Sequence, residues 1–172
     1  ELTVAAEICE DVWVPCPPSI RHALEGATLI VNCSASDETT GKDVYRHDLI
    51  CGQSARLVCG YVYANAGEGE STQDLVFGGQ NIIAENGTCL AESGRFANSF
   101  LTADLDLERL NSERRRMTTF GAAHDLSGAG FGGDGEHGYQ TVYFSLDGEE
   151  QQKGREKAQQ PDRLLRFIDK AP

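Results

Sequence analysis

The sequence is poor in basic residues: 15 lysines and arginines stand against 27 aspartates and glutamates, giving a formal net charge of −12. Nucleic-acid phosphates are bound by clustered lysine and arginine, so this balance argues against a nucleic-acid partner. No stretch approaches the roughly 20 apolar residues of a membrane-spanning helix, and no signal-peptide pattern is present. We therefore expect a cytoplasmic protein that binds neither membrane nor nucleic acid.

Methionine is also scarce, because Met117 is the only one and the chain opens on Glu1, inside an expected strand. We therefore expect the 172 residues to be a piece of a longer protein. A hydrophobic content of 40% is nevertheless enough for one domain with its own core.

The six cysteines include no pair with the C-x-x-C spacing typical of zinc and redox sites, so we expect no metal site. A chain of this length with several apolar segments does not need a disulfide scaffold. Cys33, Cys51, Cys59 and Cys89 stand in apolar surroundings, and we expect them to be reduced core residues.

The segment that organises the chain is the apolar run Val4–Ile8, which stops abruptly at Cys9, Glu10 and Asp11. This pattern predicts a thiol at the carboxyl end of a buried strand, where open α/β sheets hold their reactive groups. The turn would aim backbone N–H groups, such as that of Glu10, at whatever the sulfur attacks. The alternative is that Cys9 is an inert core residue closing the strand.

A strand–helix–strand unit follows from the next residues. Pro17-Pro18-Ser19 is typical of a helix start, and Gly26 of a left-handed helix stop. Thr28–Asn32 is a short apolar run, which predicts a strand buried on both faces and parallel to the first.

The rest of the first 120 residues predicts one long helix and several strands. We expect a helix at 43–59 with a small-residue stripe, then a strand at Tyr61–Asn65. Leu75–Phe77 and Asn81–Ala84 predict a hairpin, and Asn86-Gly87 indicates a further turn. Alternation of apolar and polar residues in Phe100–Leu107 predicts a half-buried strand.

The last third differs in composition. We expect three parts: a main domain at 1–120, a glycine-rich loop at 121–138, and a final strand and linker at 139–172. The final part comprises a strand at 139–146, a linker at 148–160 and a short helix at 163–168. The loop contains GAGFGG, but no strand precedes it and no helix pattern follows, so we reject a dinucleotide site.

Six blocks of sequence, in order, resemble one family. That family is the glutamine-hydrolysing domain of the glutamine-dependent NAD synthetases, a branch of the nitrilase (carbon–nitrogen hydrolase) superfamily. The resemblance covers Leu2–Leu110 densely and thins afterwards. The blocks are EICEDVWVP, NCSAS (32–36), GKDVYRH (41–47), QSAR (53–56), YVYANAGEGEST (61–72) and DLVFGGQ (74–80).

The resemblance implies an α/β fold, namely the carboxyl-terminal half of a nitrilase-type α-β-β-α sandwich. It also implies a Glu–Lys–Cys triad that releases ammonia from glutamine, with Cys9 as the nucleophile. The triad's Glu and Lys precede the cysteine in the family, and only eight residues precede Cys9 here.

Further site residues are also implied by the resemblance. Glu10 would supply an oxyanion N–H, while Ser36 and Lys42 match glutamine-binding positions. Their alternatives are a turn-capping serine and a solvated surface lysine. The loop before Gly41 departs from the family pattern by being more acidic, with Asp37 and Glu38.

The same resemblance implies partners outside the chain. The ammonia would pass to a carboxyl-terminal synthetase domain that uses ATP, Mg and deamido-NAD, and we expect a homo-oligomer. No cofactor is expected in the 172 residues themselves. Two other hypotheses stay open: a stand-alone amidase or nitrilase, and a catalytically inert interaction piece.

Overall fold

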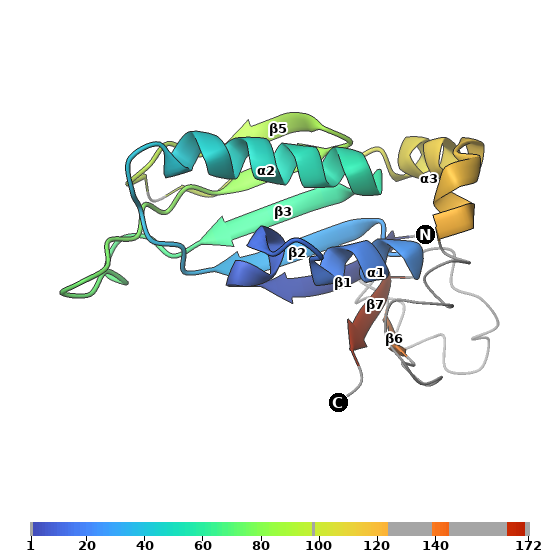
Figure 1. The fold of residues 1–172 in the computed structure, drawn as a ribbon, viewed down its shortest axis with the longest axis horizontal. Helices are drawn as coiled ribbons and strands as arrows, with labels where there is room; N and C mark the ends of the chain where they lie inside the picture. Colours follow the sequence, from blue (N-terminus) through green and yellow to red (C-terminus); the bar gives the residue numbers. More distant parts are fainter. Residues whose placement is uncertain (1, 98, 124–138, 145–164, 171–172) are drawn as a thin grey trace, which may run out of the picture.

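A computed structural model of the chain describes residues 2–97, 99–123, 139–144 and 165–170. Its strands form one seven-stranded sheet in the order β5-β4-β3-β2-β1-β7-β6 (Figure 1). Within these ranges, no helix combines the length and apolar character that a membrane crossing requires. The elements are β1 Leu2–Ile8, the 3₁₀ helix η1 Cys9–Trp13, α1 Pro18–Leu24, β2 Leu29–Ser34, α2 Lys42–Leu57, β3 Gly60–Asn65, β4 Ile82–Glu85, β5 Thr88–Glu92, α3 Leu107–Arg116, β6 Tyr139–Phe144 and β7 Leu165–Lys170.

The centre of the sheet is parallel, as the strand–helix–strand pattern predicts. β2 pairs in parallel with both β1 and β3, and β7 is parallel to β1 on its other side. α1 connects β1 to β2, with Pro18 in its first turn and Gly26 at φ +99° just beyond its end. The predicted proline start and glycine stop of this helix are therefore confirmed.

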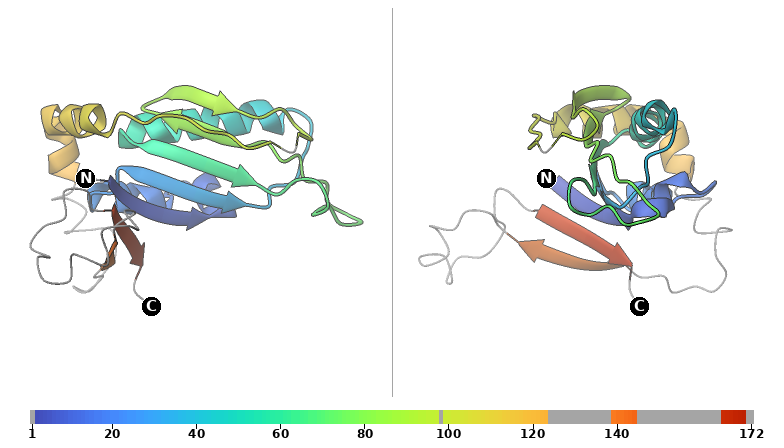
Figure 2. Two further views of the ribbon diagram at one scale, coloured as in Figure 1. Left: turned by 180° about the vertical axis from the view of Figure 1, so that it is seen from behind. Right: turned by 90° about the vertical axis from the view of Figure 1, so that its left-hand side faces the viewer.

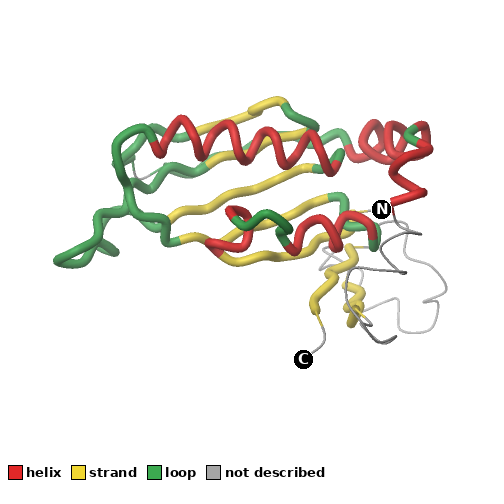
Figure 3. Tube along the Cα trace, viewed as in Figure 1, coloured by secondary structure: helices red, strands yellow, loops and turns green. Residues whose placement is uncertain are grey.

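The connecting helices α1 and α2 cover the same face of the sheet. α1 and α2 lie in front of the strands in Figures 1 and 3, and the view from behind in Figure 2 shows the other face without a helix over it among the described residues. Ala5, Ile30 and Tyr61 are fully buried in the core that the helices share. Alternate residues such as Val31 and Val62 are only half-buried on the bare face. This sheet with its helix layer is one half of the expected four-layer sandwich, and the predicted α/β class is confirmed.

The position of Cys33 corrects one expectation. The thiol is exposed rather than part of the core, because strand alternation turns it away from the helices while Asn32 and Ser34 face them. Cys59 is fully buried as predicted, and burial raises the pKa of its thiol to about 12. All six cysteines are free.

The predicted strand at Phe100–Leu107 is wrong. Residues 101–106 have no regular secondary structure and no strand partner in the described residues, and α3 begins at Leu107. The alternation is nevertheless real, since Leu101, Ala103 and Leu105 are half-buried and the residues between them exposed. The alternation of apolar and polar residues correctly indicated which side chains are buried. It could not indicate whether the backbone has a neighbouring strand to bond with.

The predicted hairpin between Leu75–Phe77 and Asn81–Ala84 is also wrong. Phe77 instead forms an isolated antiparallel bridge with Asp37, in the loop before α2, while β4 pairs with β3 and β5. Apolar residues around a glycine pair fit both arrangements, and spacing alone cannot reveal the distant partner. The turn at Asn86-Gly87 is confirmed, because it joins β4 to β5.

In the last third, the strand predicted at 139–146 is confirmed as β6, whereas the helix predicted at 163–168 is the strand β7. β7 completes its backbone hydrogen bonds by pairing with both β1 and β6, which a short local pattern cannot show. The linker at 148–160 and residues 124–138 of the glycine-rich loop lie outside the described residues. The division into three parts stays a prediction.

A buried polar network lies under the carboxyl ends of the central strands. Glu7 is 2% exposed and accepts hydrogen bonds from the Tyr61 hydroxyl and, at 2.8 Å, from the Ser19 N–H. The Tyr61 hydroxyl in turn accepts from Asn32 Nδ2 at 3.4 Å. The network joins β1, β2, β3 and α1. Burial raises the pKa of Glu7 above its ordinary value, and these hydrogen bonds offset only part of that rise.

One arginine ties α3 to the rest of the fold. The Arg114 guanidinium donates to the carbonyls of Ala27, Leu57 and Val58 at 2.7–3.0 Å. Two of these carbonyls stand at the end of α2, where helix carbonyls lack partners within the helix. Arg114 therefore caps the carboxyl end of α2 and, by the same hydrogen bonds, anchors α3 to the rest of the fold.

We predict that Arg114→Lys lowers the free energy of unfolding by about 1–3 kcal/mol, because a single ammonium cannot match the guanidinium fork and leaves buried carbonyls unpaired. Urea denaturation followed by circular dichroism measures the change. Arg115→Lys, at the exposed neighbouring position, is the matched control and should change stability by less than about 0.5 kcal/mol. Equal effects of the two substitutions would contradict the anchoring role.

We also predict that Glu7→Gln makes the protein less sensitive to pH. The folded pKa of Glu7 is raised above its ordinary 4.5, so its contribution is fully present below that pH and is lost as the pH rises through the folded value. The glutamine side chain has nearly the same shape as that of glutamate, but it does not ionise in this pH range. The variant's unfolding free energy, relative to the parent's, should therefore rise as the pH is raised from about 4.5.

Urea denaturation at a series of pH values measures this difference between Glu7→Gln and the parent. Glu108→Gln, on the exposed side of α3, is the control and should follow the parent at every pH. A difference between Glu7→Gln and the parent that stays constant with pH would show that Glu7 is ionised at no cost.

Candidate functional site

Cys9 lies where the chain leaves the centre of the sheet. It directly follows β1, which is flanked by β2 and β7, and it is the first residue of η1. The backbone of Cys9 is left-handed, with φ +48°, a conformation that costs about 1–2 kcal/mol for a residue with a β-carbon. Cys9 is half-buried, so the predicted position at the end of a strand and at a sharp turn is confirmed, while its role as a nucleophile stays a prediction.

The strained turn is held by the neighbouring strand. Cys9 N–H donates to Asn32 Oδ1 at 3.1 Å, and Asn32 Nδ2 donates back to the Cys9 carbonyl at 3.4 Å. Ser34 fixes the same amide oxygen by donating to it at 2.7 Å. A second clamp comes from Asp11, whose carboxylate accepts from Ile8 N–H at 2.7 Å. Hydrogen bonds on both sides of the turn thus hold the backbone that carries the sulfur.

Asn32 is a site residue that the sequence analysis passed over. It is 1% exposed, and it contacts both the Cys9 turn and Tyr61 of the Glu7 network. The available signal was a lone amide at the end of an otherwise apolar run, because a buried polar side chain needs partners.

Lys42 is the first residue of α2, and its ammonium pairs with the carboxylate of Asp37. The same ammonium stands 5.5 Å from the centre of the Trp13 ring. Trp13 in turn meets Tyr45 edge-on, with the ring centres 5.2 Å apart. Because Trp13 ends the short helix that Cys9 begins, these contacts bring the start of α2 up to the cysteine turn.

Ser36 is held separately, just beyond the end of β2. It is 5% exposed, its N–H donates to Asn65 Oδ1 at 2.8 Å, and its carbonyl accepts from Asn65 Nδ2 at 3.4 Å. Asn65 ends the adjacent strand β3. The structure therefore places Ser36 along the same strand ends as Cys9. Glu10 is exposed on η1.

The acidic loop before α2, with Asp37 and Glu38, has a physical role. Lys42 donates to Asp37 and thereby lowers the pKa of that carboxyl below its ordinary value. Glu38 pairs with the fully buried Arg46 at 3.2 Å, and Arg46 also donates to Gln80. Each of these two acids thus matches a cation on the first turns of α2, a pairing that sequence spacing did not single out.

The chemistry available here is that of a thiol nucleophile. A thiol at the carboxyl end of a central strand, one ammonium and a neighbouring carboxylate suit a substrate that carries an amide and amino-acid charges.

Comparison with known proteins gives the family. The sequence profile of the carbon–nitrogen hydrolase family matches residues 2–115. The glutamine-dependent NAD(+) synthetase of Mycobacterium tuberculosis is 53% identical over 116 residues, which are 66% of this chain and 17% of that protein. The human glutamine-dependent NAD(+) synthetase is 33% identical over 119 residues, covering 67% of this chain and 17% of its own length.

The fold has a counterpart among solved structures. A nitrilase-superfamily protein from Saccharomyces cerevisiae superposes with a TM-score of 0.57 at 22% identity, over 67% of this chain and 41% of that chain. At this identity the likeness concerns the fold, and it confirms the predicted nitrilase-type arrangement. The resemblance to the NAD synthetases in the six blocks is confirmed as well. Since the profile matches more than half of the residues, the chain belongs to the carbon–nitrogen hydrolase family.

Proposed function

We propose that this chain carries the nucleophile and part of the substrate site of a glutamine-hydrolysing enzyme. The observation that carries the proposal is the left-handed turn at Cys9, clamped by Asn32 and joined through Trp13 to Lys42. Strain of this kind persists when surrounding contacts enforce it, and it is concentrated at functional sites.

In the proposed reaction, Cys9 Sγ attacks the side-chain amide carbon of glutamine and forms a tetrahedral intermediate. The C–N bond then breaks, the nitrogen takes a proton and leaves as ammonia, and a thioester remains. Water attacks the thioester, which releases glutamate and restores the thiol. The Glu10 N–H would donate to the developing oxyanion.

Substrate selection falls to the other residues. Lys42 would bind the α-carboxylate of glutamine, and its partner Asp37 stands where a carboxylate could meet the α-ammonium. Ser36 would hydrogen-bond the same amino-acid end. A charged pair of this kind favours an amino-acid amide over the uncharged amides or nitriles of a stand-alone hydrolase.

The role in a larger protein is inferred from the relatives' names. The chain spans 17% of the length of the NAD(+) synthetases above, so their whole activity enters only as a proposal. Ammonia released here would be passed to a synthetase domain in the same polypeptide, in a cytoplasmic homo-oligomer. That domain would hold ATP, Mg and deamido-NAD, and no step at Cys9 uses them.

We predict that a glutamine analogue with a diazoketone in place of the amide labels Cys9 in preference to the other five thiols. The clamped turn presents this sulfur, whereas Cys59 is buried and the exposed Cys33 lies on the face of the sheet turned away from α1 and α2. Peptide mass spectrometry locates the adduct, and added glutamine should slow its formation. Labelling that simply follows thiol exposure, with Cys16 and Cys33 reacting first, would contradict the proposal.

The contribution of Lys42 is tested in the same experiment. Lys42→Met keeps the length of the side chain but removes the ammonium, so labelling of Cys9 should slow by about tenfold or more and glutamine should protect less. Arg109→Met is the matched control, because it removes one cation from an exposed part of α3. Equal rates in the two variants would remove Lys42 from the substrate site.

We further predict that the 172 residues alone release no glutamate from glutamine above the uncatalysed rate. The base and the lysine of the implied triad would lie before Cys9. The eight residues there hold no lysine, and their acids are Glu1 and Glu7, of which Glu7 is buried in the network under the turn. A coupled glutamate assay on the purified chain measures this. Steady turnover that is lost in Cys9→Ala would show that the triad account is wrong.

A further inference from the structure

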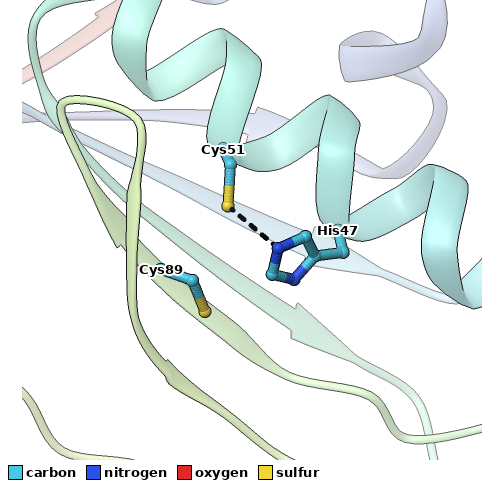
Figure 4. A group of neighbouring side chains, drawn as sticks. All are labelled: His47, Cys51 and Cys89. Atoms are coloured by element: carbon cyan, nitrogen blue, oxygen red, sulfur yellow. Dashed lines mark hydrogen bonds between the residues drawn. The ribbon is translucent and has the colours of Figure 1, made fainter.

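We propose that His47, Cys51 and Cys89 form a binding site for one zinc-like divalent transition-metal ion. His47 and Cys51 lie one turn apart on α2, and Cys89 faces them from the edge strand β5 (Figure 4). One potential ligand atom from each residue lies within 4.8 Å of the others. This site is separate from Cys9 and does not depend on the proposed reaction.

The separations suit a tetrahedral ion. With metal–sulfur and metal–nitrogen bonds of about 2.3 and 2.0 Å, the ligand atoms of a tetrahedral site are about 3.5–3.8 Å apart. Cys51 Sγ and His47 Nε2 are 3.8 Å apart, the pair joined by the dashed line in Figure 4. The remaining separations need to close by at most about 1 Å, which small side-chain rotations supply.

The histidine is already oriented for metal binding. His47 Nδ1 donates to Glu92 Oε2 at 2.8 Å, which leaves the lone pair of Nε2 directed toward the sulfurs. The other oxygen of Glu92 accepts from Gln80 Nε2 at 2.6 Å, and Gln80 is 4% exposed. A carboxylate that holds the far nitrogen of a histidine, and is itself held, is the usual outer arrangement of metal sites.

Charge and ligand type favour a borderline-soft cation over calcium or magnesium. Two thiolates and an imidazole prefer zinc, cobalt or related ions, whereas calcium and magnesium prefer oxygen ligands. Each thiol gives up its proton to solvent as the ion binds, so the two thiolates neutralise the dication. The His47 side chain is 36% exposed, so the ion has an entry path and water can take the fourth position.

A disulfide between Cys51 and Cys89 is the competing use of the same sulfurs. A disulfide would involve neither His47 nor Glu92. A metal ion would be bound by His47 and both cysteines, with Glu92 holding the histidine ring. The ion would fasten the edge strand β5 to α2, the helix that begins at Lys42.

The test is a titration of the purified, reduced and metal-free chain with Co²⁺ and Zn²⁺. We expect one equivalent of Co²⁺ to produce thiolate charge-transfer and tetrahedral absorption bands, and Zn²⁺ to remove them. Zn²⁺ should also raise the midpoint of thermal unfolding, because it binds the folded state. Cys89→Ser and His47→Gln should each remove the bands or weaken binding at least tenfold, and Glu92→Gln should weaken it about 10- to 100-fold.

Cys33→Ser is the matched control, since it removes an exposed thiol on the opposite face of the sheet and should leave binding unchanged. His47→Gln changes a partly exposed side chain and keeps the test decisive if a cysteine variant unfolds. The proposal is overturned if Co²⁺ binds equally to the His47 and Cys89 variants. It is also overturned if the reduced chain binds no Zn²⁺, or if the chain purifies without metal and with a Cys51–Cys89 disulfide.

Discussion

The fold and the candidate site depend on the same contact, the grip of Asn32 on the turn at Cys9. A residue with a β-carbon enters the left-handed region only when its surroundings offset the cost. Asn32 supplies this by bonding both the N–H and the carbonyl of Cys9. It is in reach because β1 and β2 pair in parallel, with Ile8 opposite Cys33. The register between β1 and β2 therefore decides whether Asn32 can hold the backbone turn that carries the sulfur.

In a chain with a net charge of −12, three basic side chains on α2 and α3 have distinct partners. Arg114 closes the end of α2, Arg46 is buried against Glu38 and Gln80, and Lys42 stays partly exposed beside Asp37. Arg114 is thus committed to structure, because the buried carbonyls that it pairs would otherwise be costly. Lys42, whose side chain is partly exposed, is the cation that we propose exchanges its partner Asp37 for a substrate.

α2 connects the two proposed sites. Its first residue, Lys42, lies beside the cysteine turn, and its second and third turns carry His47 and Cys51 toward β5. An ion bound there would fix the helix against the edge of the sheet without touching the reacting groups. The stability of the sheet edge and the position of Lys42, the proposed substrate-binding lysine, would then be linked through one rigid element.

The sequence by itself determined the parallel strand–helix–strand unit, the turn at Cys9 and the family. These features are local: apolar runs, prolines and glycines act over a few residues, and they agree with the tertiary packing. The tertiary structure decided what lies far apart along the chain. Among the described residues it gave 101–106 no strand partner, it made 165–170 a strand beside β1, and it turned Cys33 to the face of the sheet away from α1 and α2. A hydrophobic pattern records which side chains are buried, whereas pairing and the meeting of side chains from different elements depend on three-dimensional neighbours.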